Sequence, residues 1–439
     1  MAQVIELPWG ADSLTIPLPK TWKVLGELLP KKTPAPKNTA AACTESLRDP
    51  FGLQALADRD LSEAKIVIIA DDHSRPTPVR DFVQPVLKEL KAGGAKDDRI
   101  EFLLANGVHR ESRIDEVERK LGKDILSRFR WRCHNAYDRE NLASLGATSR
   151  GTKVFINKLL LQADLIVCLG AIEPHLLLGF GGGLKMIVPG CAGAETIGNN
   201  HLQGVDPDHF DFVGATAEDS PMRLDLEEAA GLLDKEIFIV NATMNEEGRP
   251  TRFFSGDPIA AHRAGTDFLQ ESVEVSVPEP ADVVVANSFP MDADLRQSIK
   301  CVGNSLYASK PGGVMLGCVL CENGLGEIPV PKKTLPYPIL RTLVRLIGKN
   351  RVLPLVKKAK KDEPIEEVFI GHFGLQMLRR NHLGLFSRNL PEDTGKKMGM
   401  ARTFTDIQAM INWAEAKTRP NATVWVFPYG GATFASRNP

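Results

Sequence analysis

Short runs of β-branched and aliphatic residues, each followed by a polar loop and an amphipathic helix, most constrain how this chain of 439 residues can fold. Residues 64–70 (AKIVIIA) form the first run, and apolar side chains at helical spacing follow from Val79 to Leu90. Further runs of the first half lie at residues 100–104, 153–156, 165–169 and 237–240. Strands that alternate with helices form parallel sheets with helices on both faces. We therefore predict an α/β fold with mostly parallel sheets.

A change of composition at residues 273–280 (VEVSVPEP) separates this series from a second one. The runs of the second series lie at residues 281–286, 314–319, 368–370 and 423–427. A chain of this length suits two or three domains. We expect two α/β domains, residues 1–275 and residues 276–439, with the active site in the cleft between them.

The charge balance and the apolar pattern argue against several classes of protein. The chain has 54 Lys and Arg residues against 55 Asp and Glu residues, and aromatic residues make up 6%. A protein without a basic excess or a stacking surface is a poor nucleic-acid binder. No stretch approaches the ~18 apolar residues of a membrane span, and the N-terminus lacks a signal-peptide pattern. We expect a cytoplasmic protein with no nucleic-acid or membrane partner.

The cysteines and one basic segment each allow two interpretations. Seven scattered cysteines are typical of reduced thiols. Cys318 and Cys321 form a single C-x-x-C in an apolar run, which favours two core thiols over a metal or redox role. Residues 331–361 are rich in Lys, Arg and Pro and contain no acidic residue. This composition favours a solvated helical excursion, and a lid or an anion-attracting patch is the alternative.

Polar side chains follow three of the predicted strands in the first half. In chain order the three loops carry Asp72 and Arg75, Asn106 and His109, and Glu173 and His175. Ligands of α/β sheets bind beyond the carboxyl ends of the strands. Three such loops together predict a functional site more strongly than any one histidine does.

Residues 170–200 form the segment with the densest chemical signal. Gly179, Gly181, Gly182 and Gly183 would let the backbone approach a ligand closely, and Lys185 follows them. The spacing fits neither a dinucleotide fingerprint nor a Walker loop. The sequence has no H-E-x-x-H and no paired C-x-x-C motifs, so a conventional zinc site is not predicted.

Taken together, these motifs resemble the nickel-dependent lactate racemase family. The matching segments, in order, are DHSRP at 72–76, NGVHR at 106–110, EPH at 173–175, GGGLK at 181–185, PG at 189–190 and NH at 200–201, with a further stretch near 294–300. The resemblance implies a nickel-pincer nucleotide as cofactor, a pyridinium mononucleotide that carries two thio-carboxyl arms and a nickel ion.

By position, the resemblance also assigns roles to individual residues. Lys185 would hold the cofactor covalently through a thioamide, and His201 would be the protein ligand of nickel. Asp72, His73, Ser74 and Arg75 match the cofactor-binding loop of the family. His109 and His175 match the two catalytic acid–base residues, and Gln297 and Lys300 match the substrate-binding pair.

These residue types suit the implied chemistry. Nickel accepts imidazole beside sulfur donors, so one histidine suffices when the cofactor brings its own sulfur and carbon ligands. The C–H bond beside a carboxylate is a very weak acid, and removal of the hydrogen as hydride avoids a carbanion. Return of the hydride to the other face inverts the centre, which requires one base on each side. Two histidines meet this need near neutral pH.

A substrate carboxylate requires a cation, and Arg75 and Lys300 are the candidates, with Gln297 as a hydrogen-bond partner. Arg296 stands beside Gln297, where lactate-specific members of the family tend to carry an aromatic residue. We therefore expect racemisation or epimerisation of a polar or anionic 2-hydroxy acid, such as malate or an aldonic acid, rather than lactate. Expected partners are this small molecule and the cofactor biosynthesis proteins, and the protein is expected to be a monomer or small homo-oligomer.

Two other functions remain open from the sequence. One is a zinc-type metal hydrolase that uses His109, His175 and His201 as a three-histidine site. The other is a non-catalytic homologue that binds a nucleotide or a hydroxy acid. Intact mass would distinguish a covalent adduct on Lys185 from bound zinc.

Overall fold

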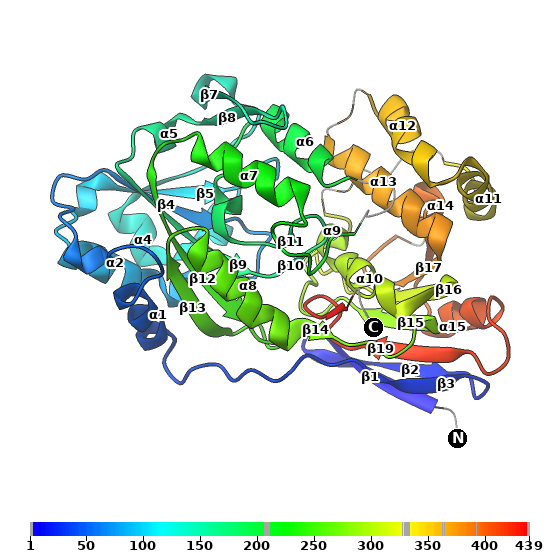
Figure 1. Cartoon of the computed structure of the whole chain (residues 1–439). Coiled ribbons are helices and arrows are strands. Elements are labelled where there is room, and N and C mark those ends of the chain that lie inside the picture. The colour runs from blue at the N-terminus through cyan, green and yellow to red at the C-terminus, as the bar shows by residue number, and fades with distance from the viewer. Residues whose placement is uncertain are drawn as a thin grey trace. The chain divides into compact units, whose positions relative to one another are not determined.

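The computed structural model describes residues 3–205, 211–326, 328, 334–361, 363, 365–391 and 393–436. It is a mixed α/β structure with two large, mostly parallel sheets, as predicted (Figure 1). The chain forms two compact units. The N-terminal unit consists of Lys32–Gly204 and Ala215–Ser272. The C-terminal unit consists of Met1–Lys31, Val205–Gly214 and Val273–Pro439.

The N-terminal unit contains a six-stranded sheet with strand order β13-β12-β9-β4-β5-β6. Five of the strands are parallel, and β13 joins the edge in the antiparallel direction. Their bounds are β4 Ile66–Asp71, β5 Ile100–Ala105, β6 Arg130–Cys133, β9 Leu165–Ile172, β12 Glu236–Met244 and β13 Pro250–Gly256. The central β4 is buried along its whole length, which explains why its sequence is a continuous aliphatic run.

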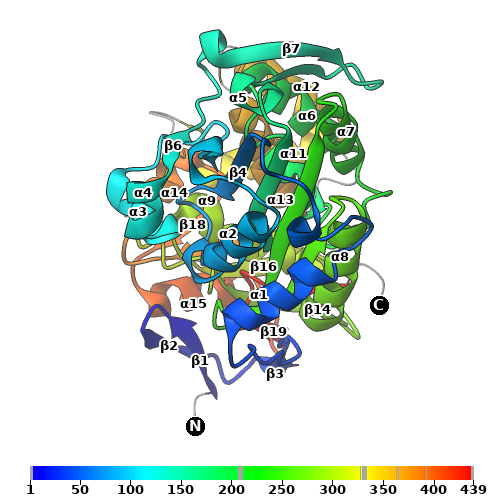
Figure 2. The same ribbon diagram turned by 90° about the vertical axis from the view of Figure 1, so that its left-hand side faces the viewer.

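Helices cover this sheet and bury a large apolar core against it. The bounds are α1 Thr39–Arg48, α2 Val83–Ala92, α3 Ile114–Leu121, α4 Lys123–Arg128, α5 Lys158–Leu161, α6 Ala194–Gln203, α7 Pro221–Gly231 and α8 Ala260–Val273. Figure 2 shows α1 and α2 next to each other, and both contribute buried side chains to the core with β4 and β5. Two small antiparallel sheets pair β7 Leu142–Ala147 with β8 Lys153–Asn157, and β10 Pro174–His175 with β11 Gly179–Phe180.

The C-terminal unit contains a second six-stranded sheet, with strand order β18-β17-β16-β15-β19-β3, in which every pair is parallel. The bounds are β3 Lys23–Glu27, β15 Ala281–Asn287, β16 Ser309–Cys318, β17 His382–Phe386, β18 Arg402–Phe404 and β19 Thr423–Phe427. Short helices α9 Leu295–Ser298, α10 Lys300–Asn304, α14 Thr394–Met398 and α15 Ile407–Glu415 connect them. A two-stranded parallel sheet pairs β14 Glu274–Val275 with β20 Phe434–Ala435.

The first residues of the chain belong to the C-terminal unit, which differs from the expected division at residue 275. β1 Gln3–Trp9 and β2 Asp12–Leu18 form an antiparallel hairpin with alternating buried side chains. These side chains join the same apolar core as β15, β16 and β19, because one face of the hairpin is hydrophobic. The break after residue 272 agrees with the composition change, whereas the N-terminal segment and Val205–Gly214 are assigned differently from the expected division.

One expected strand is wrong. Residues 368–370 lie inside helix α13, Ile365–Arg380. The apolar run there is only three residues long, and apolar side chains continue at helical spacing to Phe373 and Met377. Val368 packs into a small core with Val344, Val352 and Val356.

The basic segment is helical where it is described, as predicted. α11 Tyr337–Ile347 and α12 Lys349–Ala359 pack against α13 (Figure 1). Residues 331–333 of the segment lie outside the described residues. Cys318 and Cys321 are buried free thiols, and burial raises the pKa of each to about 12. In the described part of the chain, no helix is both long and apolar enough to cross a membrane.

Candidate functional site

Three adjacent strands of the N-terminal unit carry the predicted polar loops at the same edge of the sheet. β4 lies between β5 and β9, and all three run in parallel. Their carboxyl ends therefore open at one edge, and the loops that follow them begin at residues 72, 106 and 173. The predicted convergence of the three loops is confirmed by this sheet order.

Asp72, Ser74 and His109 form a hydrogen-bonded cluster at the ends of β4 and β5. His109 Nδ1 donates to Asp72 Oδ2 over 2.7 Å. Ser74 donates to Asp72 Oδ1 with its hydroxyl at 2.7 Å and with its backbone N–H at 3.1 Å. Ser74 Oγ also lies 3.4 Å from His109 Nδ1. Both carboxylate oxygens are thus occupied, and the His109 ring is held in one orientation.

The charge of Asp72 is stabilised although its side chain is buried. Burial alone raises the pKa of this carboxyl, but the charge of His109 and hydrogen bonds from His109 and Ser74 hold it well below its ordinary value. A carboxylate behind Nδ1 keeps the ring proton on that atom. Nε2 of His109 is then the basic nitrogen.

His73 points to a different neighbour. Its Nδ1 lies 3.1 Å from Ser112 Oγ, which also accepts a hydrogen bond from Asn106 Nδ2 at 3.2 Å. Burial lowers the pKa of His73, and the charge of Asp72 acts in the opposite direction. His73 is therefore part of the contact between the β4 and β5 loops.

Arg75 pairs with Glu173, and its charge also helps to lower the pKa of Asp72. Arg75 Nη1 donates to Glu173 Oε1 over 2.6 Å, and both side chains are largely buried. The pair connects the loop after β4 with the loop after β9. A carboxylate already offsets the charge of Arg75, so this guanidinium is less available to a substrate anion than the sequence suggested.

Lys120 is a residue of this site that sequence reasoning missed. It lies on α3, and its Nζ donates to Asp71 Oδ1 at 2.7 Å, to Arg75 O at 2.8 Å and to Thr77 O at 3.1 Å. Burial raises the pKa of Asp71, and the ammonium group of Lys120 counteracts this. Lys120 thereby fixes the loop that presents Asp72, but no local motif marks it in the sequence.

His175 lies in the small hairpin of β10 and β11 that follows β9. Its Nδ1 accepts a hydrogen bond from the backbone N–H of Leu177 at 3.2 Å. In a neutral ring this leaves the proton on Nε2. The two predicted acid–base histidines therefore have opposite tautomers, with a basic Nε2 on His109 and an Nε2–H on His175.

Lys185 lies in a 3₁₀ turn, Gly183–Met186, directly after the glycine run. A Cβ atom on Gly182 would lie 2.9 Å from Ala171 O and from Asn241 Oδ1, and one on Gly183 would lie 2.9 Å from the His262 ring. Both glycines also have positive φ values, 78° and 61°. At these two positions protein atoms occupy the space that a side chain would need, which gives a packing reason for glycine, and the approach of the backbone to a ligand stays a prediction.

Three buried polar side chains form hydrogen bonds with the backbone of the glycine-rich segment. Asn241 Oδ1 accepts from Gly183 N at 2.7 Å, and His262 Nε2 donates to Gly181 O at 2.8 Å. Arg223 donates to the carbonyl oxygens of Phe180 and Gly182. Burial lowers the pKa of Arg223 to about 10.

Sequence reasoning missed these three residues as well. A signal existed for Asn241, which directly follows the predicted strand at 237–240. Arg223 and His262 lie on helices, and only their tertiary contacts reveal them.

His201 lies near the end of α6 and has a tautomer that suits a metal ligand. Its Nδ1 is 2.7 Å from Ile197 O, so the ring proton is on Nδ1 and Nε2 carries the lone pair. This matches a single imidazole donor to a metal that brings its other ligands with it. Within the described ranges, no three His, Cys, Asp or Glu side chains form a group that could hold a metal ion. The three-histidine site of the hydrolase alternative is therefore not formed.

The predicted substrate residues belong to the C-terminal unit. Asp294 caps α9 by accepting from Gln297 N at 2.9 Å, and Lys300 begins α10. Gln297 and Lys300 are buried, with 3% and 9% of their surface exposed. Gln297 Oε1 is buried and accepts no hydrogen bond from the described residues. Arg296 is half-buried.

Comparisons with known proteins agree with the motifs. The profile of the lactate racemase N-terminal domain matches residues 9–210. Lactate racemase from Thermoanaerobacterium thermosaccharolyticum is 32% identical over 326 residues, which cover 73% of this chain and 75% of the relative. Lactate racemase from Lactiplantibacillus plantarum is 31% identical over 284 residues, 64% of this chain and 66% of the relative.

Solved structures extend the likeness to nearly the whole chain. The lactate racemase apoprotein from Thermoanaerobacterium thermosaccharolyticum has a TM-score of 0.83 and 26% identity, and covers 99% of this chain and 100% of its own. A protein from Thermotoga maritima has a TM-score of 0.65 at 20% identity, over 91% of this chain and 98% of its own, which indicates a shared fold.

Proposed function

Because the chain belongs to the lactate racemase family, we propose that it inverts the C2 configuration of a 2-hydroxy acid by reversible hydride transfer to a nickel-pincer nucleotide. The observation that carries the proposal is the 2.7 Å contact between Asp72 and His109 at adjacent strand ends. It supplies an oriented base at the edge of the sheet where α/β proteins bind ligands.

His109 would take the proton of the substrate hydroxyl at Nε2. Asp72 fixes the ring through Nδ1 and stabilises the imidazolium that this transfer forms. Ser74 holds the second carboxylate oxygen, so Asp72 cannot turn away from the ring. These contacts favour a positioning role for Asp72 and Ser74 in addition to the cofactor-loop role that the family resemblance implies.

His175 would serve the opposite face of the substrate. With its proton on Nε2 it can donate to the substrate oxygen, whereas His109 accepts from it. To become an acid, His175 must take a second proton at Nδ1, which requires loss of the Leu177 hydrogen bond. The two histidines are therefore proposed as unequal partners that exchange protonation states in each turnover.

Lys185 and His201 would hold the cofactor, with Lys185 as its covalent attachment point and His201 Nε2 as the nickel ligand. When bound, the nucleotide supplies a hydride acceptor that can return the hydride to either face of the keto acid. Asn241, Arg223 and His262 fix the segment on which Lys185 stands. Arg75, balanced by Glu173, is better suited to a cofactor group than to the substrate carboxylate.

Lys300 and Gln297 would bind the substrate carboxylate, and Arg296 would select a second polar or anionic group. Arg296 acts on Glu367, a buried carboxyl whose pKa is raised by burial and lowered by the charges of Lys360 and Arg296. Its charge is therefore shared with the protein. The guanidinium itself favours a larger polar hydroxy acid, such as malate or an aldonic acid, because a substrate that ends in a methyl group offers it no hydrogen-bond acceptor.

Intact mass and chiral analysis test the proposal directly. Protein produced together with the cofactor pathway should carry a mass increment that peptide mapping assigns to Lys185, and it should racemise at least one 2-hydroxy acid. Lys185→Ala should lose both properties, whereas Lys153→Ala, a change at an exposed lysine, should keep them. Racemisation by Lys185→Ala would overturn the proposal, as would wild-type protein that carries the adduct but converts no hydroxy acid.

A substrate panel tests the assignment of Arg296. We expect dicarboxylic and sugar-derived 2-hydroxy acids to be converted faster than lactate, and Arg296→Phe to reduce this preference. Faster conversion of lactate than of every dicarboxylate and sugar acid would contradict the role of Arg296 and leave the assignment of Lys185 intact.

A further inference from the structure

Three arginines surround a hollow at the amino-terminal edge of the sheet in the C-terminal unit. The hollow has a volume of about 440 Å³ and is lined by Pro311, Gly312, Arg345, Arg379 and Arg380. Arg345 comes from α11, Arg379 and Arg380 end α13, and Pro311 and Gly312 lie at the start of β16. Gln297 and Lys300 follow the carboxyl end of β15, which is parallel to β16. The hollow therefore lies at the opposite edge of the sheet from these two residues.

None of the three arginines forms an ion pair with a carboxylate among the described residues, although the charge of the buried Asp211 acts against the lowering of the pKa of Arg380 by burial. Three cations that share one hollow repel one another unless an anion joins them. Burial, followed by the charges of Arg341, Lys417 and Arg345, lowers the pKa of the neighbouring His382 to about 4. The positive potential of this region therefore contributes to the pKa shift of a nearby side chain.

Two of the arginines are fixed in place by hydrogen bonds. Arg380 donates to Ser309 O at 2.9 Å, to Asn381 Oδ1 at 2.6 Å and to Leu306 O at 3.4 Å. Arg379 Nε donates to the buried Gln376 Oε1 at 2.8 Å. A group that is already ordered loses less entropy when it binds a ligand.

The loop beneath the arginines is equally well ordered. Asn381 is fully buried, and its Nδ2 donates to Ser309 Oγ, Lys310 O and Gly313 O. A Cβ atom on Gly312 would meet nothing within 4 Å, so the mouth of the hollow is open at this residue. The hollow thus combines a rigid base with an accessible entrance.

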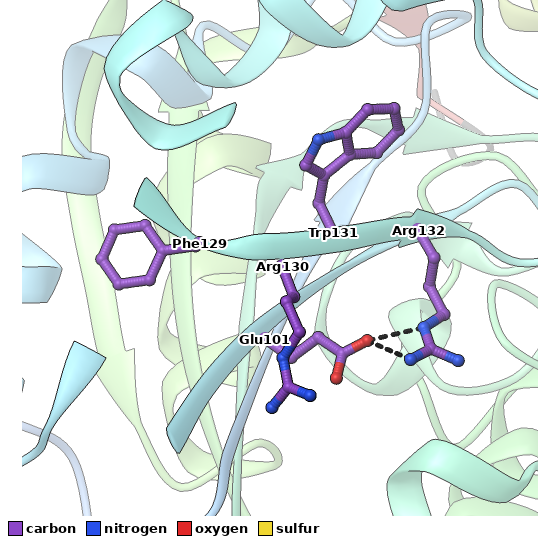
Figure 3. Close-up of a pocket in the computed structure, with 5 residues that line it drawn as sticks. All are labelled: Glu101, Phe129, Arg130, Trp131 and Arg132. Carbon is purple, nitrogen blue, oxygen red and sulfur yellow. Dashed lines mark hydrogen bonds and ion pairs between the residues drawn. The ribbon is translucent and has the colours of Figure 1, made fainter. Parts of the chain in front are cut away.

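A second hollow of the same volume provides a comparison. It lies on the edge strand β6 of the N-terminal unit and is lined by Glu101, Phe129, Arg130, Trp131 and Arg132. There Arg132 Nε donates to Glu101 Oε1 at 2.6 Å, so the carboxylate balances one of the two arginines (Figure 3). The arginine hollow of the C-terminal unit has no such carboxylate in its lining.

We propose that the hollow formed by Arg345, Arg379 and Arg380 binds a small soluble anion with two adjacent phosphate groups, such as a diphosphate ester. Guanidinium groups match phosphate oxygens in pairs, and three of them balance a diphosphate better than a single carboxylate. The volume is within the range of small-molecule sites. This site is separate from the racemase site and does not depend on the cofactor.

Calorimetric titration of the full-length protein with inorganic pyrophosphate at low ionic strength tests the proposal. Wild type should bind one pyrophosphate per chain in a saturable manner. Arg345→Gln and Arg379→Gln should each weaken binding about tenfold or more, the loss of one charge-assisted contact. Arg351→Gln is the matched control, because Arg351 is exposed on α12 and does not line the hollow. It should bind as wild type does.

Unfolding temperatures measured on the same samples show whether each variant is folded. Arg345→Lys, which keeps the charge and loses the paired donors, should bind with intermediate affinity if Arg345→Gln proves unstable. Three outcomes would overturn the proposal: no saturable binding by wild type, equal weakening by Arg351→Gln, or binding to anionic lipid vesicles by a protein that ignores pyrophosphate.

Discussion

In the N-terminal unit the charged side chains beside the strand ends are balanced by partners from the same chain, whereas the arginines in the hollow of the C-terminal unit are not. Asp72 meets His109, Arg75 meets Glu173 and Asp71 meets Lys120. Around the hollow, Arg379 and Arg380 donate to backbone carbonyls and side-chain amide oxygens, and Arg345 is exposed. Ion pairs within the chain fix the geometry of the side chains proposed to react. Arginines without an ion-pair partner remain available to bind an anionic ligand.

The largest expected effect is on kcat and comes from the paired side chains at the strand ends of the N-terminal unit. His109→Ala should lower kcat by roughly 10²–10⁴-fold, because a positioned base is removed. Asp72→Asn should lower it by about 10–100-fold, because the ring loses the partner that orients it. Chiral chromatography of the best substrate, with cofactor content checked by mass, measures both. An Asp72→Asn enzyme with wild-type kcat would show that the pair contributes only to structure.

The buried pair of Asp71 and Lys120 is expected to dominate stability. Lys120→Met should destabilise the fold by ~3–5 kcal/mol, because a buried carboxylate loses its counter-charge. Urea unfolding measures this change. The double variant Lys120→Met, Asp71→Asn should recover a large part of the loss, since neither charge is then left alone. Additive losses in the double variant would mean that the two side chains are not coupled.

Asp292 is a buried carboxyl in the C-terminal unit. Among the described residues it forms no ion pair with a cation, in contrast to Asp71 and Asp72 of the N-terminal unit. Burial raises its pKa to about 6, while a hydrogen bond from Ser288 acts against this shift. Its folded pKa lies above the unfolded value, so its contribution to stability is complete below about pH 4 and falls as the pH rises to about 6.

Asp292→Asn should therefore stabilise the protein above pH 6 by on the order of 2 kcal/mol, with little effect near pH 4. Thermal unfolding of both proteins between pH 4 and pH 8 measures the difference. A constant difference across this range would show that Asp292 does not titrate as the structure indicates.

The smallest effect should come from the arginine hollow in the absence of ligand. Arg345 is exposed, and the stability of Arg345→Gln should lie within about 0.5 kcal/mol of wild type. A loss above 2 kcal/mol would show that Arg345 is part of the internal structure, and the contrast between the two regions would then disappear.

The sequence was most informative where the physical signal is local. Aliphatic runs predicted the central strands closely, since a buried parallel strand needs a continuous apolar segment. The rule that ligands bind at carboxyl ends led to Asp72 and His109 before any contact was known. Residues 368–370 show the limit of this approach, because a run of three apolar residues suits a helix as well as a strand.

Residues that act across the sequence could not be predicted in the same way. Lys120, Arg223 and His262 lie on helices, and each reaches a loop that is distant in the chain. The glycines of the segment before Lys185 were correctly singled out, but two of them serve close packing against Asn241 and His262. A glycine pattern indicates that other atoms pack closely against the backbone, and only the structure shows whether these atoms belong to the protein.

The position of β3 has a consequence for how the protein is made. This strand is at residues 23–27, at the edge of the sheet, and among the described residues it pairs with β19, at residues 423–427. A ribosome therefore releases β3 long before its partner exists, and the sheet of the C-terminal unit can close only after residues 423–427 have been made. Removal of residues 420–439 would delete β19 and leave β3 without the strand with which it pairs.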